Sequence, residues 1–92
     1  MKLVQFAVPE RVGTICAEVA AAIAGGATLI PGMGWWVDNR GEVQRESVSW
    51  LVVGTPEDKI NELISNIKSI LKTSNESAVF YVVGSEPKLE WL

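Results

Sequence analysis

The chain contains no histidine and only one cysteine among its 92 residues. Histidine is the commonest general base and metal ligand in proteins, so its absence excludes Ser-His-Asp and Cys-His catalysis and the usual zinc sites. A single cysteine cannot form a disulfide within the chain, and Cys16 falls on an apolar helical stripe, where a buried hydrophobe is expected rather than a nucleophile. We therefore expect no cofactor, no metal site and no catalytic residue.

Positive charge is also scarce, with 8 Lys and Arg residues against 11 Asp and Glu and a net charge of -3 at pH 7. Binding to a phosphate backbone requires a clustered excess of Lys and Arg, so we expect no nucleic-acid partner. The chain does not open with the charged and apolar segments of a signal peptide, which makes the cytoplasm the expected compartment. The uncharged run from Val19 to Val37 contains Gly and Pro residues that break a helix, so we expect no membrane span.

Apolar residues, in contrast, are abundant. They make up 48% of the chain, and the mean hydropathy is +0.21. A small domain does not need that much apolar sequence to fill one core, so we expect part of it to form a subunit interface in a homo-oligomer of two or more chains. The length suits a single domain, which we assign to residues 1–84, and we interpret residues 85–92 as a C-terminal tail.

Apolar periodicity predicts an α+β fold. The expected elements are a strand at 2–8, a helix with apolar residues from Val12 to Ile23 that Gly25 ends, a hairpin with its turn at 38–41, a second helix with an apolar stripe from Ile60 to Leu71, and a strand at 77–83. Thr55 and Pro56 resemble an N-cap and a first helical residue. The order of these elements predicts a ferredoxin-like βαββαβ domain, in which a four-stranded antiparallel sheet has both helices on one face. The other face is then uncovered.

The first strand of the hairpin carries residues that are unusual inside a sheet. Pro31, Gly32 and Gly34 weaken a ladder of hydrogen bonds, because proline lacks an N–H and glycine has no side chain to pack. They predict an edge strand, a bulge, or a place where a ligand or another backbone comes close.

Tryptophan is concentrated in and beside this hairpin. Counting outward from the turn pairs Trp35 with Gln44 and Trp36 with Val43. Neighbouring residues of a strand point to opposite faces, so one of the two indoles is expected outside the helix-packed core.

The two faces of the hairpin then have different expected roles. If the even-numbered positions of 48–52 face the helices, Trp35 is a core aromatic, and Trp36 shares the uncovered face with Arg45 and Ser47. An aromatic ring beside a guanidinium and hydroxyls suits a flat anionic ligand, because the ring can stack on a base while Arg45 binds phosphate. An oligomer interface, which also favours Trp and Arg, is the equally consistent alternative.

Positions 25 to 46 carry Gly25-Gly26, Thr28, the run Gly32-x-Gly34-x-Trp36, Asp38, Gly41 and Glu46. This set resembles a pattern shared by small ferredoxin-like proteins encoded in phage genomes and in some bacteria. Among the phage proteins, the chain is most similar to the Thoeris anti-defence sponges, homo-oligomers that sequester cyclic ADP-ribose-type immune signals. It departs from them in being short and in having only a brief tail after the last predicted strand, where they carry additional helical structure.

The resemblance implies a phage-type protein in the cytosol of a bacterial host that binds a cyclic nucleotide or cyclic ADP-ribose-type signal without cleaving it. It implies Trp36 as the stacking residue and Glu46 as the acid beside it, and its motif includes Thr28. Arg45 and Ser47 complete the expected ligand site on the grounds of residue type. The expected partner is thus a small nucleotide-like ligand.

Two alternatives remain open. Glu42 and Glu46 lie four residues apart on one predicted strand and could act as acid and base, or hold a hard cation, although we favour a solvated strand end as the explanation of this pair. The first alternative is therefore a small dimeric ferredoxin-like enzyme that uses these carboxylates or Arg45. The second is a structural or protein-binding phage module.

Overall fold

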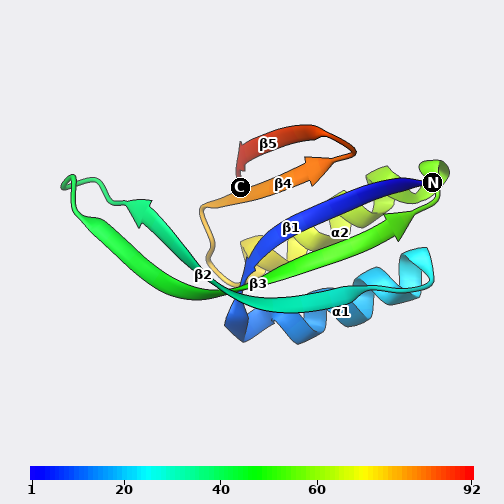
Figure 1. Cartoon of the computed structure of the whole chain (residues 1–92), viewed down its shortest axis with the longest axis horizontal. Helices are drawn as coiled ribbons and strands as arrows, with labels where there is room; N and C mark the ends of the chain where they lie inside the picture. Colours follow the sequence, from blue (N-terminus) through cyan, green and yellow to red (C-terminus); the bar gives the residue numbers. More distant parts are fainter.

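Five strands form one antiparallel sheet, and two helices cover one of its faces (Figure 1). The computed structural model describes residues 1–92. In chain order the elements are β1 (Lys2–Pro9), α1 (Glu10–Ala24), β2 (Thr28–Val37), β3 (Val43–Thr55), a short 3-10 turn (Glu57–Lys59), α2 (Ile60–Thr73), β4 (Ala78–Val83) and β5 (Glu86–Trp91). The strands lie in the order β2-β3-β1-β4-β5, which places β1 at the centre and β2 and β5 at the edges.

The predicted α+β fold is confirmed, but the sheet has five strands and not four. The additional strand, β5, lies in the segment that we expected to be a tail, and it pairs with β4 along its full length. Gly84 and Ser85 form the connection, in which Gly84 has a left-handed φ of 63° and donates its N–H to the Leu3 carbonyl (2.7 Å). A two-residue connection that begins with glycine is typical of a hairpin, so the sequence contained a signal for this strand.

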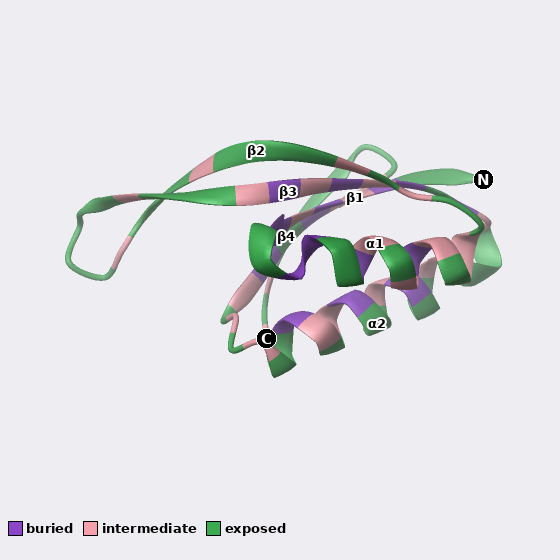
Figure 2. Ribbon diagram, turned by 90° about the horizontal axis from the view of Figure 1, so that it is seen from below, coloured by how far each residue is buried: buried purple, intermediate pink, exposed green.

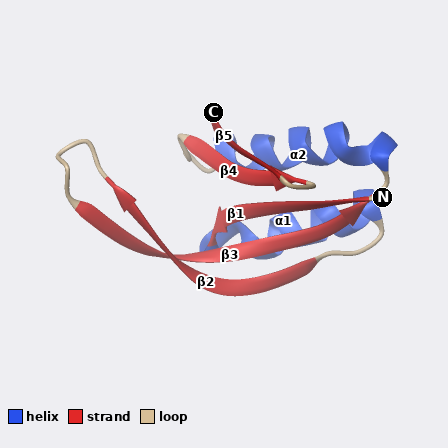
Figure 3. Cartoon of the chain, turned by 45° about the horizontal axis from the view of Figure 1, so that its top comes forward, coloured by secondary structure: helices blue, strands red, loops and turns tan.

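The core lies between the helices and the covered face of the sheet (Figure 3). The central strand β1 contributes Val4, Phe6 and Val8, none of which is exposed to solvent. Phe6 stacks on Tyr81 of β4, with ring centroids 5.6 Å apart. The other buried apolar residues are Val12, Cys16 and Ala20 of α1, Leu51 and Val53 of β3, Leu63, Ile67 and Leu71 of α2, and Val79 of β4. The apolar stripe predicted for the second helix therefore faces the core, as expected.

Cys16 is part of this core and is fully buried. Desolvation by burial raises the pKa of its thiol to about 11, so the thiol stays protonated at neutral pH. The structure confirms the expectation of a small buried hydrophobe at this position.

The helices cover the opposite side of β3 from the one we expected. Ser49 and Val53 face them and are buried. Gly13 of α1 permits this contact, because a Cβ at that position would lie 2.6 Å from the Ser49 hydroxyl oxygen. Trp50 lies on the other side of β3, where its indole N–H donates to the side chain of Gln5 (2.9 Å). Both alternating rows of β3 are apolar here, so alternation alone could not identify the covered side.

The helix ends agree only in part with the predictions. As expected, α1 ends at Gly25, which has a φ of 98° and donates its N–H to the Ala21 carbonyl (2.8 Å). The predicted N-cap at Thr55 is wrong, because this residue is buried and its hydroxyl donates instead to the Val53 carbonyl (3.4 Å). The 3-10 turn follows, and α2 begins only at Ile60. Neither helix is long and apolar enough to cross a membrane.

Replacing Gly13 with Ala is expected to destabilise the fold, although a helix interior ordinarily favours alanine over glycine by about 1 kcal/mol. The added Cβ would meet buried Ser49, and overpacking of this kind costs roughly 1–3 kcal/mol. Urea unfolding followed by circular dichroism measures the change. The control is Gly26→Ala, because a Cβ at Gly26 meets nothing within 4 Å. A Gly13→Ala variant as stable as the parent would contradict this packing.

Candidate functional site

Asp38 organises the turn between β2 and β3. Its Oδ1 accepts hydrogen bonds from the backbone N–H groups of Arg40 and Glu42 (both 2.9 Å), and its Oδ2 accepts one from the side chain of Gln44 (2.8 Å). Gly41 completes the turn with a φ of 82°. These hydrogen bonds, first the one from the Glu42 backbone, lower the pKa of Asp38, so its carboxylate is charged at neutral pH. The predicted turn is confirmed, and it includes Glu42 as well.

Because Glu42 belongs to the turn, the register of the hairpin differs by one residue from the predicted register. Trp35 lies opposite Arg45, and Trp36 lies opposite Gln44. The two indoles still belong to opposite sides of the hairpin, but Arg45 shares the side of Trp35 rather than that of Trp36.

The outer part of the hairpin, residues 31–47, projects beyond both helices as a two-stranded ribbon that we call the hairpin arm (Figure 2). On the side that continues the covered face of the sheet, its exposed apolar residues are Met33, Trp35, Val37 and Val43. The expectation that Trp35 is a core aromatic is wrong, because 63% of it is exposed where no helix covers the arm. A two-stranded ribbon is marginally stable by itself in water, so this composition favours contact with another chain.

The glycines of β2 make room for a side chain of β3. The pairing of β2 with β3 is continuous, so β2 is an edge strand without a bulge. A Cβ at Gly34 would lie 3.1 Å from Cγ1 of Val48, and a Cβ at Gly32 would lie 3.6 Å from its Cγ2. Of the three explanations that the sequence offered for Pro31, Gly32 and Gly34, the structure supports the edge strand, and it adds a close side-chain contact at Gly34 that the sequence did not predict.

The structure brings together only two of the five residues predicted to bind a ligand. Trp36 and Glu46 lie on the same side of the hairpin arm as diagonal neighbours. Arg45 and Ser47 lie on the other side. Thr28 is at the inner end of β2, roughly 26 Å from Trp36 at about 3.3 Å per residue. All five are exposed to solvent.

The predicted pair of carboxylates on one strand does not form. Glu42 belongs to the turn, and only Glu46 lies in β3. The structure also contains no group of three or more His, Cys, Asp or Glu side chains that could hold a metal ion. Because Glu42 is the fifth residue of the turn, Glu42 and Glu46 do not lie on one face of a strand. The acid–base alternative depended on that geometry.

The uncovered face of the sheet, which we call the open face, is mostly apolar. It carries Leu3, Gln5 and Ala7 of β1, Thr28, Ile30 and Trp36 of β2, Glu46, Val48, Trp50 and Val52 of β3, Ala78, Phe80 and Val82 of β4, and Pro87, Leu89 and Trp91 of β5. Near its centre, the rings of Trp50 and Phe80 lie 6.3 Å apart. Apart from Met1 and Ile15, every exposed large apolar residue lies on the open face or on the other side of the hairpin arm.

The alternation of side chains along β5 indicates which face of the sheet favours contact with another chain. Its apolar residues Pro87, Leu89 and Trp91 lie on the open face, and its charged residues Glu86, Lys88 and Glu90 lie on the helix side. Trp91 is 80% exposed, which is unfavourable for the largest apolar side chain. This arrangement favours burial of the open face in an assembly. The sequence predicted a tail here, with Trp91 and Leu92 docked on its own or a neighbouring subunit, and the strand was missed, although the strict alternation over 86–91 is a strand signal.

Comparisons with known proteins find solved structures of similar fold, but they find no match to a protein family by sequence. No protein-family model matches the chain, and no curated protein matches its sequence. A phage SAM lyase in complex with S-methyl-5′-thioadenosine has a TM-score of 0.75 and 11% sequence identity, over 99% of this chain and 89% of that chain. The PII-like protein CutA from Nostoc sp. PCC 7120, in apo form, has a TM-score of 0.67 and 20% identity, over 90% and 78%. CutA from Synechococcus elongatus PCC7942 has a TM-score of 0.70 and 15% identity, over 95% and 78%.

These likenesses concern the fold. They support the expected ferredoxin-like type of fold, which a phage protein also has. The narrower similarity to the Thoeris sponges stays a prediction.

The expectation that the chain is not an enzyme is corrected by the same comparison. A lyase has this fold over nearly the whole length of both chains. The absence of histidine therefore excludes particular kinds of catalysis, and it does not exclude catalysis on this fold.

Replacing Asp38 with Ala is expected to loosen the hairpin turn while the core stays folded, because the backbone N–H groups of Arg40 and Glu42 lose their acceptor. Amide hydrogen exchange measured by NMR should show lower protection at these two residues. Asp38→Asn keeps one acceptor oxygen, so protection of these amides in this variant should lie between that in the parent and that in Asp38→Ala.

The turn should also respond to pH. Hydrogen bonding lowers the pKa of Asp38 in the folded state, so its stabilisation is complete above the ordinary Asp pKa and is lost as pH falls through the lower folded-state value. The amide proton shifts of Arg40 and Glu42 report that titration. A midpoint at or above the ordinary Asp pKa would contradict the hydrogen bonding described.

Proposed function

We propose that this protein is a homo-oligomeric enzyme that binds S-adenosylmethionine, or a related sulfonium nucleoside, and cleaves a carbon–sulfur bond in it. The observation that carries this proposal is that Trp36 and Glu46 are diagonal neighbours, whereas Arg45 lies on the other side of the hairpin arm. An indole beside a carboxylate suits a ligand with a flat base and a positive charge. The predicted register had placed the indole beside a guanidinium, which suits an anion.

The reaction suits a chain without histidine. Cleavage of the bond between the sulfonium sulfur and the amino acid portion leaves both bonding electrons on sulfur and releases S-methyl-5′-thioadenosine, a neutral thioether. This leaving group needs no proton, and the carbon that it leaves can form a new bond to the carboxylate of the same substrate. Such a step depends on orientation more than on a general acid or an activated water. The phage lyase of this fold, whose structure contains S-methyl-5′-thioadenosine, supports this choice of reaction.

Each residue of the pair then has a defined task. The ring of Trp36 stacks on the adenine, and the carboxylate of Glu46 binds the α-ammonium group in the amino acid portion of the substrate. Both side chains are exposed in the single chain. A ligand site requires enclosure, because small molecules bind where most of their surface is buried.

Assembly through the open face supplies that enclosure. This face carries half of the exposed large apolar side chains of the protein, and β5 directs Leu89 and Trp91 to it. A second copy of the chain that covers the open face would also cover Trp36 and Glu46, which belong to the same face. The site that we propose therefore lies between subunits.

The capture of a cyclic ADP-ribose-type signal is a second candidate function. The resemblance over residues 25–46 to the Thoeris sponges favours it. The pairing of a tryptophan with an arginine on the other side of the hairpin arm also favours it. Trp35 lies opposite Arg45, and Ser47 is on the same side. An indole, a guanidinium and a hydroxyl suit a base that carries phosphates.

The assembly is tested by placing a charge on the open face. Leu89→Lys and Trp91→Lys should each convert a dimer or larger assembly into monomers, because an unpaired buried charge costs about 3–5 kcal/mol. Light scattering measures the mass, and circular dichroism verifies the fold. Glu86→Lys is the control, since Glu86 lies on the helix side of the same strand. A parent protein that is already monomeric at micromolar concentration, or equal dissociation by the control, would contradict the interface.

The reaction is tested by incubating the protein with S-adenosylmethionine and measuring S-methyl-5′-thioadenosine by liquid chromatography and mass spectrometry. We expect release of this product. Trp36→Ala and Glu46→Gln should each lower kcat/KM about tenfold or more, as expected for the loss of one stacking contact or one charged hydrogen bond. Arg45→Gln, on the other side of the arm, should change it little.

Incubation with cyclic ADP-ribose isomers, together with the S-adenosylmethionine assay, separates the two candidate functions. Depletion of cyclic ADP-ribose isomers from solution, with a loss of depletion in Arg45→Gln and no thioadenosine product, would favour signal capture. An assembled protein that neither turns over S-adenosylmethionine nor depletes the cyclic nucleotides would contradict both candidates and leave the interface result unaffected.

A further inference from the structure

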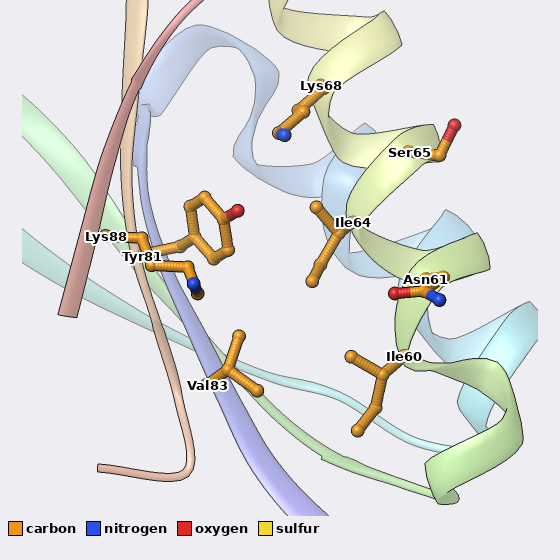
Figure 4. Close-up of a pocket in the computed structure, with 8 residues that line it drawn as sticks. All are labelled: Ile60, Asn61, Ile64, Ser65, Lys68, Tyr81, Val83 and Lys88. Carbon is orange, nitrogen blue, oxygen red and sulfur yellow. The ribbon is translucent and has the colours of Figure 1, made fainter. Parts of the chain in front are cut away.

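A groove of about 500 Å³ lies on the helix side of the molecule, between α2 and the β4–β5 pair (Figure 4). It is remote from the open face, because its strand residues Tyr81, Val83 and Lys88 lie on the opposite side of the sheet. Its volume falls within the range of small-molecule sites, roughly 300–1,000 Å³. Neither the proposed reaction nor the proposed subunit interface uses it.

The floor of the groove is apolar. Ile60 and Ile64 of α2 and Val83 of β4 are half-buried and point into the same space (Figure 4). Their inner surfaces pack against the core, and their outer surfaces line the groove. This floor suits an apolar ligand body and gives no reason for a fully hydrated ion to bind.

The rim of the groove carries two ammonium groups. Lys68 of α2 donates a hydrogen bond to one carboxylate oxygen of Glu90, and the Tyr81 hydroxyl donates to the other oxygen. Lys88 of β5 has no ion-pair partner. The side chains of Asn61 and Ser65 add polar groups on the helix side of the rim.

The hydrogen bonds to Glu90 fix the charges at this rim. The bond from Lys68, and then the bond from Tyr81, lower the pKa of Glu90, so this carboxylate is charged at neutral pH. Burial, together with Glu90, raises the pKa of Tyr81 to about 12, so the hydroxyl remains a donor. Glu90 neutralises one of the two lysines, and Glu86, the other acid on this side of β5, does not line the groove. One positive charge is left beside an apolar floor.

From this geometry we infer that the groove binds a small organic anion, in which an apolar body lies against Ile60, Ile64 and Val83 and a carboxylate or phosphate head meets Lys88 and Lys68. Lys68 can serve both Glu90 and the ligand, because an ammonium group has three donors. The two possible head groups, carboxylate and phosphate, are both anions attached to an alkyl body. The probes below distinguish them.

The experiment is a two-dimensional amide NMR titration of the full chain with hexanoate, hexyl phosphate, hexanol and inorganic phosphate. The inference expects saturable shifts at residues 60–68 and 81–88 with hexanoate, hexyl phosphate or both, and at least tenfold weaker binding of hexanol and of inorganic phosphate. The preferred head group is the one whose alkyl derivative binds more tightly. Shifts confined to the open face or the hairpin arm, equal binding of hexanol, or no binding of any probe would overturn it.

Variants test the two halves of the groove separately. Lys88→Gln should raise the Kd of the tighter anion about tenfold. Lys72→Gln is the control, because Lys72 is an exposed lysine of α2 that does not line the groove. Val83→Thr keeps the shape of the side chain and should weaken the alkyl anions severalfold. Equal effects of the Lys72 and Lys88 changes would show a general charge effect and overturn the site.

Discussion

The structure depends on a sheet that is apolar on both faces while its two helices cover only one. The covered face contains Val4, Phe6 and Val8 of the central strand, and these residues anchor a core to which both helices contribute. The open face carries Trp50 and Phe80 and is left without a layer of its own. Exposure of apolar surface to water is unfavourable in free energy. The uncovered face therefore bears on both the assembly of the protein and the position of the ligand site that we propose.

The two ends of the sheet meet this constraint differently. At one edge, β5 places apolar residues on the open face and charged residues on the helix side, so a single strand both extends the open face and contributes Lys88 to the rim of the groove. At the other edge, β2 and β3 continue past the helices as the hairpin arm, which exposes Met33, Trp35, Val37 and Val43 on one side and Trp36 on the other. The two ligand sites that we propose correspond to this division, one between subunits and one within the chain.

Charge placement decides which ligand each region suits. In the hairpin arm, a one-residue difference in register places Glu46 near Trp36 and moves Arg45 to the side of Trp35. A cationic ligand therefore suits the open-face side, and an anionic ligand suits the other. In the groove, Glu90 is occupied by Lys68 and Tyr81, which leaves Lys88 to attract an anion.

Periodicity and turn chemistry are local properties of a chain, and they were sufficient to predict the α+β class, both helices, the central strand and the turn at Asp38. The covered side of β3 depends on tertiary packing, because both of its alternating rows are apolar and the helices bury the row of Ser49, Leu51 and Val53, where Gly13 leaves room for Ser49. The tertiary structure also decided the register at Trp36, where the carboxylate of Asp38 draws the N–H of Glu42 into the turn. A shift of one residue transfers every side chain of a strand to the other face, so the candidate site depended on a contact that no local pattern specifies.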